Sequence, residues 1–329
     1  MPNIVFLDSF VLNPGDLDWG ALAEQGQLTV YERTPRAEVV VRAAEAEVII
    51  LNKVRITAEI LDRLPRLRLI LVAATGYDVV DVAAARERGV TVCNVPAYGT
   101  LAVAQHTLAL LLEVTNRVGQ YAQLNREGYW SRSRDFSLWN EAVEELSGVR
   151  VSLIGMGNIG RKVAELLRVL EAEVCAVTSQ DESMLPTGVR KITLDEAFAT
   201  SRVVSLHCPL TPETKHIINT ESIAKMKPGV MIINTGRGQL INTEDLIEGL
   251  RTKRIGSAGL DVYEEERNYF YEDRSDKMID DDVLARLLMV PNVVLTSHQA
   301  FFTEEALHNI ALTTLDSIKE LEQGLPLTN

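Results

Sequence analysis

The stretch "VSLIGMGNIGRKVAELL", residues 151–167, combines three local signals that decide the fold. A short apolar run typical of a buried strand leads into Gly155-x-Gly157-x-x-Gly160, and an amphipathic helical pattern follows. The tight turn needs Gly155, Gly157 lets the backbone approach a pyrophosphate, and Gly160 lets helix and strand pack closely. The glycine motif alone is weak evidence, because glycines also make ordinary turns. With a strand before it and a helix after it, it favours dinucleotide binding.

The same alternation of strand and helix patterns extends to both sides of this stretch. With 329 residues, the chain is long enough for two domains. Strands are predicted at residues 4–7, 28–31, 48–51, 67–73, 90–95, 151–154, 174–177, 203–206, 230–234, 257–262 and 293–297. A long helix is predicted over 102–126, and a last helix over 303–321 with Thr303 as its N-cap. Short apolar runs alternating with helices indicate an α/β fold with parallel sheets.

Composition excludes several classes of protein. The net charge of −13 argues against binding to nucleic acid or to anionic membranes. The longest apolar region, residues 101–114, is interrupted by Gln105 and His106 and predicts a buried helix and not a membrane span. The first residues show no basic leader. The cysteines lack metal-ligand spacing, so we expect no metal site and three reduced thiols in a cytoplasmic protein; they are Cys93, Cys175 and Cys208.

Polar side chains follow three strands of the second series. Thr235-Gly236-Arg237-Gly238 follows the strand at 230–234, and His298 ends the strand at 293–297. Asp261 lies within the strand at 257–262, and a run of three glutamates, 264–266, comes soon after it. Taken singly, these are ordinary surface charges and a structural histidine. Because parallel strands present their carboxyl ends at one edge, we expect a cation, carboxylates and an imidazole to converge there.

Five segments, taken in order, resemble the successive signatures of the D-isomer-specific 2-hydroxyacid dehydrogenases. They are "GMGNIG", "SLHCPLTPETKHIIN", "KPGVMIINTGRGQLI", "GLDVYEEE" and "TSHQAFFTEEAL". The resemblance covers nearly the whole chain. The C-terminal part is more similar to fermentative D-lactate dehydrogenase, and the N-terminal part to bacterial glycerate (hydroxypyruvate) dehydrogenase. The resemblance therefore leaves two substrate choices open: pyruvate on one side, and hydroxypyruvate and glyoxylate on the other.

The resemblance implies two Rossmann-like or flavodoxin-like βαβ domains. Residues 1–101 and 300–329 would form a discontinuous substrate-binding domain, and residues 102–299 a dinucleotide-binding domain. The active site would lie in the cleft between the domains. A homodimer is also implied, formed largely by the long helix and the tryptophan-containing segment after it.

The resemblance also assigns roles in catalysis to three residues. Arg237 would hold the substrate carboxylate and polarise the keto group, since a guanidinium binds such oxygens in pairs. His298 would donate a proton to the carbonyl oxygen during reduction and accept it during oxidation. Glu266 would pair with His298 and fix the orientation of its ring. Glu264 and Glu265 are expected to be solvated.

Further positions are expected to bind cofactor or substrate. The positions expected to contact the cofactor lie in the glycine motif, at the end of the next strand and in three later loops. They are Gly155, Gly157, Asn158, Ile159, Gly160, Thr178, Ser179, His207, Cys208, Pro209, Thr235, Gly236 and Asp261. The substrate pocket would use Thr75 and Gly76 for the carboxylate and Tyr98 and Phe301 as walls, beside Arg237. Trp139 would reach the partner's pocket or simply belong to the dimer interface.

The cofactor form is the open question in the stretch "VCAVTSQDES", residues 174–183. Thr178 stands where this family usually has an aspartate that binds the adenosine ribose and repels a 2′-phosphate. We therefore expect NAD(H) to be favoured and NADP(H) to be possible. No cation lies within the Thr-Ser-Gln segment, but Arg161, Arg190 and Lys191 are possible sources of positive charge.

Two functions from other classes remain open at this stage. The same fold serves non-catalytic dinucleotide-sensing corepressors, although the complete set of Arg237, Glu266 and His298 argues against that function here. A flavin or S-adenosylmethionine protein is disfavoured, because neither needs this set.

Overall fold

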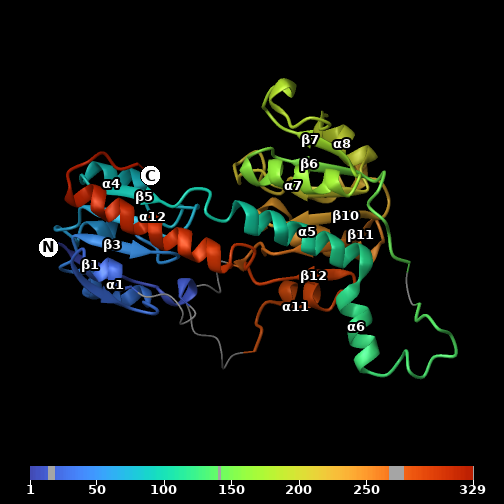
Figure 1. Cartoon of the computed structure of the whole chain (residues 1–329), viewed down its shortest axis with the longest axis horizontal. Helices are drawn as coiled ribbons and strands as arrows, with labels where there is room; N and C mark the ends of the chain where they lie inside the picture. Colours follow the sequence, from blue (N-terminus) through green and yellow to red (C-terminus); the bar gives the residue numbers. More distant parts are fainter. Residues whose placement is uncertain (14–18, 140–141, 267–277, 329) are drawn as a thin grey trace. The chain divides into compact units, whose positions relative to one another are not determined.

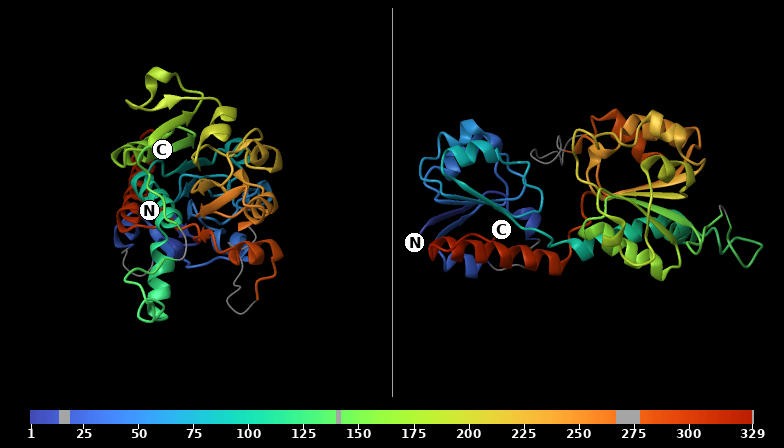
Figure 2. Two further views of the ribbon diagram at one scale, coloured as in Figure 1. Left: turned by 90° about the vertical axis from the view of Figure 1, so that its right-hand side faces the viewer. Right: turned by 90° about the horizontal axis from the view of Figure 1, so that it is seen from above.

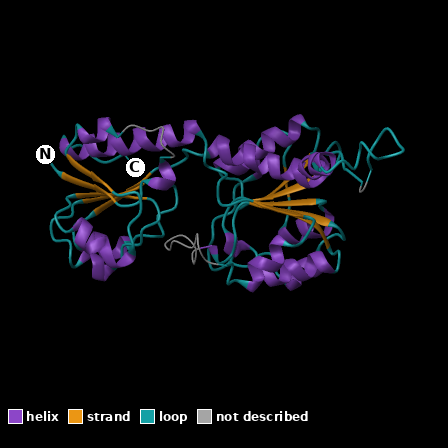
Figure 3. Ribbon diagram, turned by 90° about the horizontal axis from the view of Figure 1, so that it is seen from below, coloured by secondary structure: helices purple, strands orange, loops and turns teal. Residues whose placement is uncertain are grey.

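The computed structural model describes residues 1–13, 19–139, 142–266 and 278–328, which form two compact units (Figure 1). The described part of unit 1 is Met1–Gly99 together with residues 302–328, and that of unit 2 is Thr100–Glu266 together with residues 278–301. Each unit has its own parallel sheet between helices (Figure 3). The predicted α/β class with two parallel sheets is therefore confirmed.

Unit 1 is built on a five-stranded parallel sheet in the order β2-β1-β3-β4-β5. Its two central strands, "VIIL" and "LILV", are buried at every residue, as expected for strands covered on both faces. Figure 2 shows the long helix α12 running along this sheet. The elements are β1 (Asn3–Phe6), η1 (Phe10–Leu12), α1 (Gly20–Ala23), β2 (Gln27–Val30), η2 (Arg36–Glu38), α2 (Val39–Ala43), β3 (Val48–Leu51), α3 (Ala58–Leu61), β4 (Leu69–Val72), α4 (Val82–Glu87), β5 (Thr91–Asn94) and α12 (Glu304–Glu322).

The carboxylate of Asp8 organises the carboxyl edge of this sheet. It follows β1 and accepts hydrogen bonds from three successive backbone amides after β3, those of Asn52 (2.7 Å), Lys53 (2.7 Å) and Val54 (3.1 Å). Burial raises the pKa of Asp8 to about 6, although these amides and the Lys53 charge act in the opposite direction. The loop after β3 is thus fixed by an acid that is costly to ionise.

Asp8 should make the stability of the chain depend on pH in an unusual direction. Its pKa in the folded chain, about 6, exceeds its ordinary value of 3.8, so the folded chain binds the proton more tightly. The contribution of Asp8 to the free energy of unfolding therefore rises as the pH falls from about 6 to 3.8, by at most about 3 kcal/mol. Urea unfolding gives the free energy of unfolding of the native chain and of Asp8→Asn across this pH range. On acidification the difference between the two should shift in favour of the native chain. A constant difference would contradict the assignment.

Unit 2 is built on a seven-stranded parallel sheet in the order β12-β11-β10-β9-β6-β7-β8. Helices α5 and α7 pack together, and the core of the unit gathers between them and strands β6, β7, β9 and β10. The elements are α5 (Thr100–Asn116), α6 (Val118–Arg126), β6 (Arg150–Ile154), α7 (Asn158–Val169), β7 (Glu173–Val177), η3 (Glu182–Met184), β8 (Arg190–Lys191), α8 (Leu194–Thr200), β9 (Val203–Leu206), α9 (Thr220–Lys225), β10 (Val230–Asn234), η4 (Gly238–Leu240), α10 (Thr243–Arg251), β11 (Ile255–Leu260), α11 (Asp282–Leu288) and β12 (Val293–Leu295).

Most of the predicted elements are present, with two differences. The helix predicted over 102–126 is two helices, because Arg117 adopts a left-handed backbone (φ 54°) between α5 and α6. The Glu113 carboxylate accepts the Gly119 amide at 3.0 Å and so caps the first turn of α6. The two-residue strand β8 was not predicted, being too short to show a period. The N-cap at Thr303 is confirmed by its hydrogen bond from the Ala306 amide (3.2 Å).

Two further observations concern the whole described chain. None of the described helices has the length and apolar character needed to cross a membrane. All three cysteines are free thiols; Cys93 and Cys175 are buried, and Cys208 is partly buried.

Candidate functional site

The glycine turn between β6 and α7 has the geometry that a dinucleotide needs. Gly155 has φ 102°, and a Cβ atom there would lie 2.5 Å from the Cys208 backbone nitrogen. A Cβ on Gly160 would lie 2.4 Å from the Gly155 carbonyl oxygen. A Cβ on Gly157 would meet nothing within 4 Å, so open space lies beside the first turn of α7, where Asn158 and Ile159 begin the helix. This space beside helix amides suits a phosphate group.

The loop after β9 lies against this turn. Its residues His207, Cys208 and Pro209 were predicted to contact the cofactor, and the close approach to Gly155 places the first two beside the motif. Burial lowers the pKa of His207 to about 4, so the imidazole is neutral at physiological pH. Its Nε2 atom lies 2.9 Å from the Ser205 hydroxyl. The loop therefore adds no charge to the site.

The loop after β10 carries Arg237, and a buried asparagine shapes it. The Asn234 side chain, 1% exposed, donates to the Arg237 carbonyl and accepts the Gly236 amide, both at 3.0 Å. Thr235 is held from α5 by a 2.8 Å bond between its hydroxyl and that of Thr107. Sequence reasoning had assigned no role to Asn234, although an asparagine that ends a buried strand just before a glycine is a signal for such a turn.

Removing the Asn234 side chain should loosen Arg237 without unfolding the chain. Asn234→Ala breaks two hydrogen bonds within the loop, and we expect kcat/KM of the reaction that the sequence resemblance implies to fall about ten- to one-hundredfold. Steady-state kinetics measure the effect. Asn242→Ala is the matched control, because it removes only the N-cap bond from the Asp245 amide in α10. Equal losses of kcat/KM in the two variants would contradict a role in positioning Arg237.

Asp261, directly after β11, anchors the loop that follows β12. Its buried carboxylate accepts the Thr296 hydroxyl at 2.6 Å and the backbone amides of Gln299 and Ala300, both at 2.9 Å. His106 of α5 approaches the same carboxylate at 3.4 Å. Burial penalises the ionised form, but these hydrogen bonds outweigh it and lower the pKa of Asp261. The sequence predicted Asp261 as a cofactor contact but missed its bracing by His106 and Thr296, because the partners are far apart in the chain.

His298 and Glu266 form a hydrogen-bonded pair at this edge. The Nδ1 atom of His298 lies 3.0 Å from Glu266 Oε1, and Glu266 Oε2 accepts the Tyr263 amide at 3.2 Å. Both side chains are largely buried, with exposed fractions of 23% and 17%. His298 has a left-handed backbone (φ 53°), and its own amide donates to the Asp261 carbonyl at 2.7 Å. The imidazole is thus fixed both through its ring and through its backbone.

Arg237, Asp261 and His298 follow β10, β11 and β12, which are adjacent and parallel. The three strand ends therefore place them along one edge of the unit 2 sheet, as the sequence predicted.

The expectation that Glu264 is solvated is wrong. Its side chain is 17% exposed, pairs with His216 at 2.5 Å and accepts the Thr243 amide at 2.8 Å at the start of α10. Glu264 therefore ties two loops together, which a run of three glutamates in sequence does not reveal. Glu265 is exposed, as expected.

The predicted substrate residues are distributed over both units. In unit 1, Thr75 and Gly76 follow β4, where the Asn94 side chain holds the Thr75 carbonyl at 2.8 Å; Tyr98 follows β5 and is partly buried. In unit 2, the Phe301 ring lies edge-on to His298, with centroids 6.5 Å apart. Trp139, also in unit 2, is 76% exposed.

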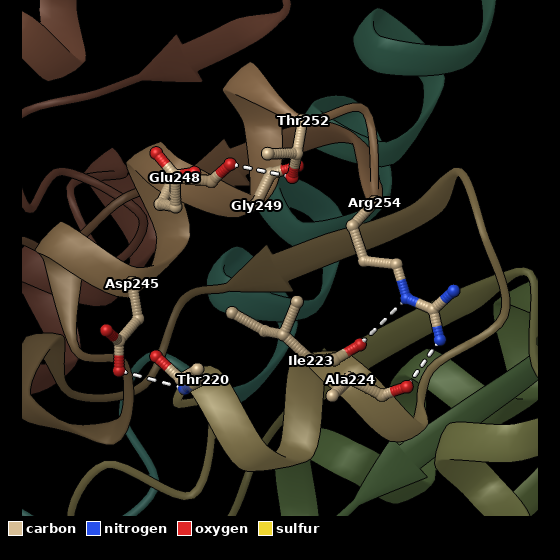
Figure 4. Close-up of a pocket in the computed structure, with 8 residues that line it drawn as sticks. All are labelled: Thr220, Ile223, Ala224, Asp245, Glu248, Gly249, Thr252 and Arg254. Atoms are coloured by element: carbon tan, nitrogen blue, oxygen red, sulfur yellow. Dashed lines mark hydrogen bonds between the residues drawn. The ribbon is translucent and has the colours of Figure 1, made fainter.

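A shallow surface pocket of about 450 Å³ lies between α9 and α10 (Figure 4). Its lining contains none of the predicted site residues; it consists of Thr220, Ile223, Ala224, Asp245, Glu248, Gly249, Thr252 and Arg254. The Arg254 guanidinium binds the carbonyl oxygens of Ile223 and Ala224. The charge of Arg254 thus serves the chain itself, and the pocket is separate from the edge that carries His298. Among the described residues, no cluster of His, Cys, Asp and Glu is arranged to hold a metal ion.

Comparison with known proteins identifies the family. Residues 108–300 match the family model described as D-isomer specific 2-hydroxyacid dehydrogenase, NAD binding domain. The hydroxypyruvate reductase of Blautia hydrogenotrophica is 37% identical over 98% of both chains. The pyruvate reductase of Chlamydomonas reinhardtii matches with a TM-score of 0.87 and 32% identity, covering 99% of this chain and 98% of that one.

A third relative was solved with its ligands. The structure of D-lactate dehydrogenase from Aquifex aeolicus, complexed with NAD and lactic acid, matches with a TM-score of 0.84 and 29% identity, covering 98% of this chain and 96% of that one. The chain therefore belongs to the D-isomer-specific 2-hydroxyacid dehydrogenases and is an NAD(H)-dependent oxidoreductase that acts on the CH–OH group of 2-hydroxy acids.

Proposed function

We propose that the chain reduces a two- or three-carbon 2-keto acid to the D-2-hydroxy acid, with hydroxypyruvate preferred to pyruvate. The observation that carries the reaction is the His298–Glu266 pair at 3.0 Å, on the same sheet edge as Arg237. The preference rests on the hydroxypyruvate reductase of Blautia hydrogenotrophica, which resembles this chain over 98% of its length. Pyruvate is the competing substrate, supported by the pyruvate reductase of Chlamydomonas reinhardtii.

The proposed mechanism assigns one task to each side chain. Reduced nicotinamide supplies the hydride when it is bound. Because Glu266 occupies Nδ1 of His298, the proton for the keto oxygen comes from Nε2. The Glu266 carboxylate accepts the hydrogen bond from Nδ1 and keeps the ring in place. Arg237 is proposed to hold the substrate carboxylate and polarise the keto group, and Thr75 and Gly76 remain proposed substrate contacts of unit 1.

We further propose that NADP(H) is accepted beside NAD(H), because Thr178 replaces the acid that excludes a 2′-phosphate. Asp261 is proposed to bind the nicotinamide amide in addition to bracing the His298 loop. Tyr98 and Phe301 are proposed as walls of the substrate pocket.

A homodimer is proposed from the surface of α6 and the segment after it. This region exposes large apolar side chains that a monomer would leave in water: Val118, Tyr129, Trp130, Phe136 and Trp139. Sedimentation equilibrium measures the assembly, and a mass of one chain at micromolar concentration would contradict it. The free thiols support a cytoplasmic location.

The test of the proposed function follows the absorbance of reduced nicotinamide. Purified protein is mixed with NADH or NADPH and with hydroxypyruvate, glyoxylate or pyruvate in parallel. We expect the highest kcat/KM with hydroxypyruvate. Higher kcat/KM with pyruvate would reverse the ranking, and no turnover with any keto acid would contradict the proposal. The alternative of a non-catalytic dinucleotide sensor is not favoured, because the relatives are enzymes.

A further inference from the structure

Two cations from different elements meet at the segment that follows β7. Arg161, in the first turns of α7, donates to the Gln180 side-chain oxygen at 2.5 Å and to the Met184 carbonyl at 2.7 Å. The Lys191 ammonium, from β8, donates to the Gln180 backbone carbonyl at 2.6 Å. Neither contact is visible in sequence, because Arg161 and Lys191 are thirty residues apart and Gln180 lies between them.

Among the described residues, no salt bridge neutralises the charge of Arg161 or of Lys191. The acceptors of their hydrogen bonds are neutral: the Met184 carbonyl, the Gln180 side-chain amide and the Gln180 carbonyl. The neighbouring cation Lys162, in contrast, pairs with Glu165. Glu182 lies close by, but its carboxylate accepts the Lys191 backbone amide at 3.4 Å and not the ammonium. Two positive charges are therefore held together on neutral partners, in a chain whose net charge is −13.

Gln180 connects these cations to the glycine turn. Its side-chain amide donates to the Met156 carbonyl, between Gly155 and Gly157, at 3.1 Å. Its backbone amide donates to the Thr178 hydroxyl at 3.2 Å. In this fold the adenosine ribose lies at the end of the second strand, where Thr178 follows β7. The cations thus border the ribose hydroxyls of a cofactor whose pyrophosphate occupies the space beside Gly157.

We propose that Arg161 and Lys191 bind the 2′-phosphate of NADP(H) and make this chain bind NADPH at least as tightly as NADH. The inference rests on the proposed function only in taking the cofactor site as real. A 2′-phosphate carries nearly two negative charges at neutral pH and offers three acceptor oxygens. Arg161 and Lys191 would exchange their bonds to carbonyl and amide oxygens for bonds to the phosphate, and the Thr178 and Ser179 hydroxyls would donate further hydrogen bonds. The acid that would repel the phosphate is absent at position 178.

Binding of the reduced cofactors, without keto acid, tests the inference. The fluorescence of NADH and NADPH is titrated with the native protein, with Arg161→Gln and with Lys191→Gln. We expect each variant to raise the Kd for NADPH about ten- to one-hundredfold and to change the Kd for NADH less than about threefold. Lys162→Gln is the matched control, since it removes an adjacent charge on the same helix. That variant should leave both affinities within the same narrow range.

Several outcomes would overturn the inference. A Kd for NADPH that is higher than the Kd for NADH in the native protein would contradict it. If Arg161→Gln lowered the affinities for NADH and NADPH equally, the effect of the substitution would be structural only. Thr178→Asp should weaken the binding of NADPH and leave the binding of NADH unchanged. An unchanged ratio of the two Kd values would argue against the assigned ribose position. Because these titrations contain no keto acid, the cofactor affinities can be measured even if the proposed substrate is not turned over.

Discussion

Exchange of His298 for asparagine should lower kcat for keto acid reduction about a thousandfold, the range expected when a general acid is lost. Asparagine carries no titratable proton, so it cannot replace the imidazolium. It also tolerates the left-handed backbone found at this position (φ 53°), so the loop is expected to keep its shape. Steady-state kinetics give kcat, and NADH fluorescence gives the Kd of the cofactor, which should stay within about threefold.

A second histidine provides a close control for this experiment. His216 also has a left-handed backbone (φ 52°) and also pairs with a glutamate, Glu264, at 2.5 Å. It lies in the loop before α9, and neither it nor Glu264 is a proposed catalytic residue. His216→Asn should therefore leave kcat within about threefold of the native value. If both variants lost activity equally, the loss at His298 would reflect the broken pair and not the proton.

Gly238→Ala should lower kcat/KM at least about a hundredfold, because the site tolerates little displacement. A Cβ atom at this position would lie 1.9 Å from the Tyr263 carbonyl oxygen, which is backbone and has to move. Gly238 adjoins Arg237, and Tyr263 binds the carboxylate of Glu266. One added methyl group therefore displaces two proposed catalytic residues at once. Overpacking should also cost about 1–3 kcal/mol of stability.

The matched control for this variant is Gly249→Ala in the same unit. There the nearest atoms to the new Cβ belong to side chains, Ile255 Cδ1 at 2.8 Å, Ile255 Cγ1 at 3.1 Å and Ile223 Cγ2 at 3.4 Å, and the terminal Ile255 carbon can rotate away. Gly249 lies within α10, where alanine is the better helix former. We expect nearly native kcat/KM and at most a small change in melting temperature. Loss of activity in both variants, or in neither, would show that the contact with Tyr263 is not decisive.

The pattern of strands could be predicted from sequence because buried parallel strands are short apolar runs. Strands β3, β9 and β10 were predicted to the residue and the others to within a few residues, except for β8, which was not predicted. The meeting of Arg237, Asp261 and His298 at one edge also followed from sequence, since parallel strands have a common direction. These are consequences of local pattern and of strand polarity, and neither depends on side-chain detail.

The supporting contacts could not be predicted, for a different physical reason. His106 and Thr296 are in contact although 190 positions of sequence separate them. Arg161 and Gln180 are in contact although they lie in different elements, 19 positions apart. Such contacts depend on the path of each side chain after the sheet has formed. The break at Arg117 is similar, because arginine gives no signal for a left-handed residue. The sequence also could not show that Glu264 is tied to His216 while Glu265 is exposed.

The discontinuity of unit 1 has a consequence for synthesis on the ribosome. Helix α12, residues Glu304–Glu322, belongs to the unit that the first 99 residues begin, and β12 completes the sheet of unit 2 only at Val293–Leu295. The main buried clusters lie within residues 5–90 and 104–233, but each unit receives its last helix or strand only when residues 293–322 have been translated. Nascent chains must therefore carry a unit 1 sheet that lacks α12 and an unfinished unit 2 sheet for most of their elongation time, and the chain depends on whatever protects it during that interval.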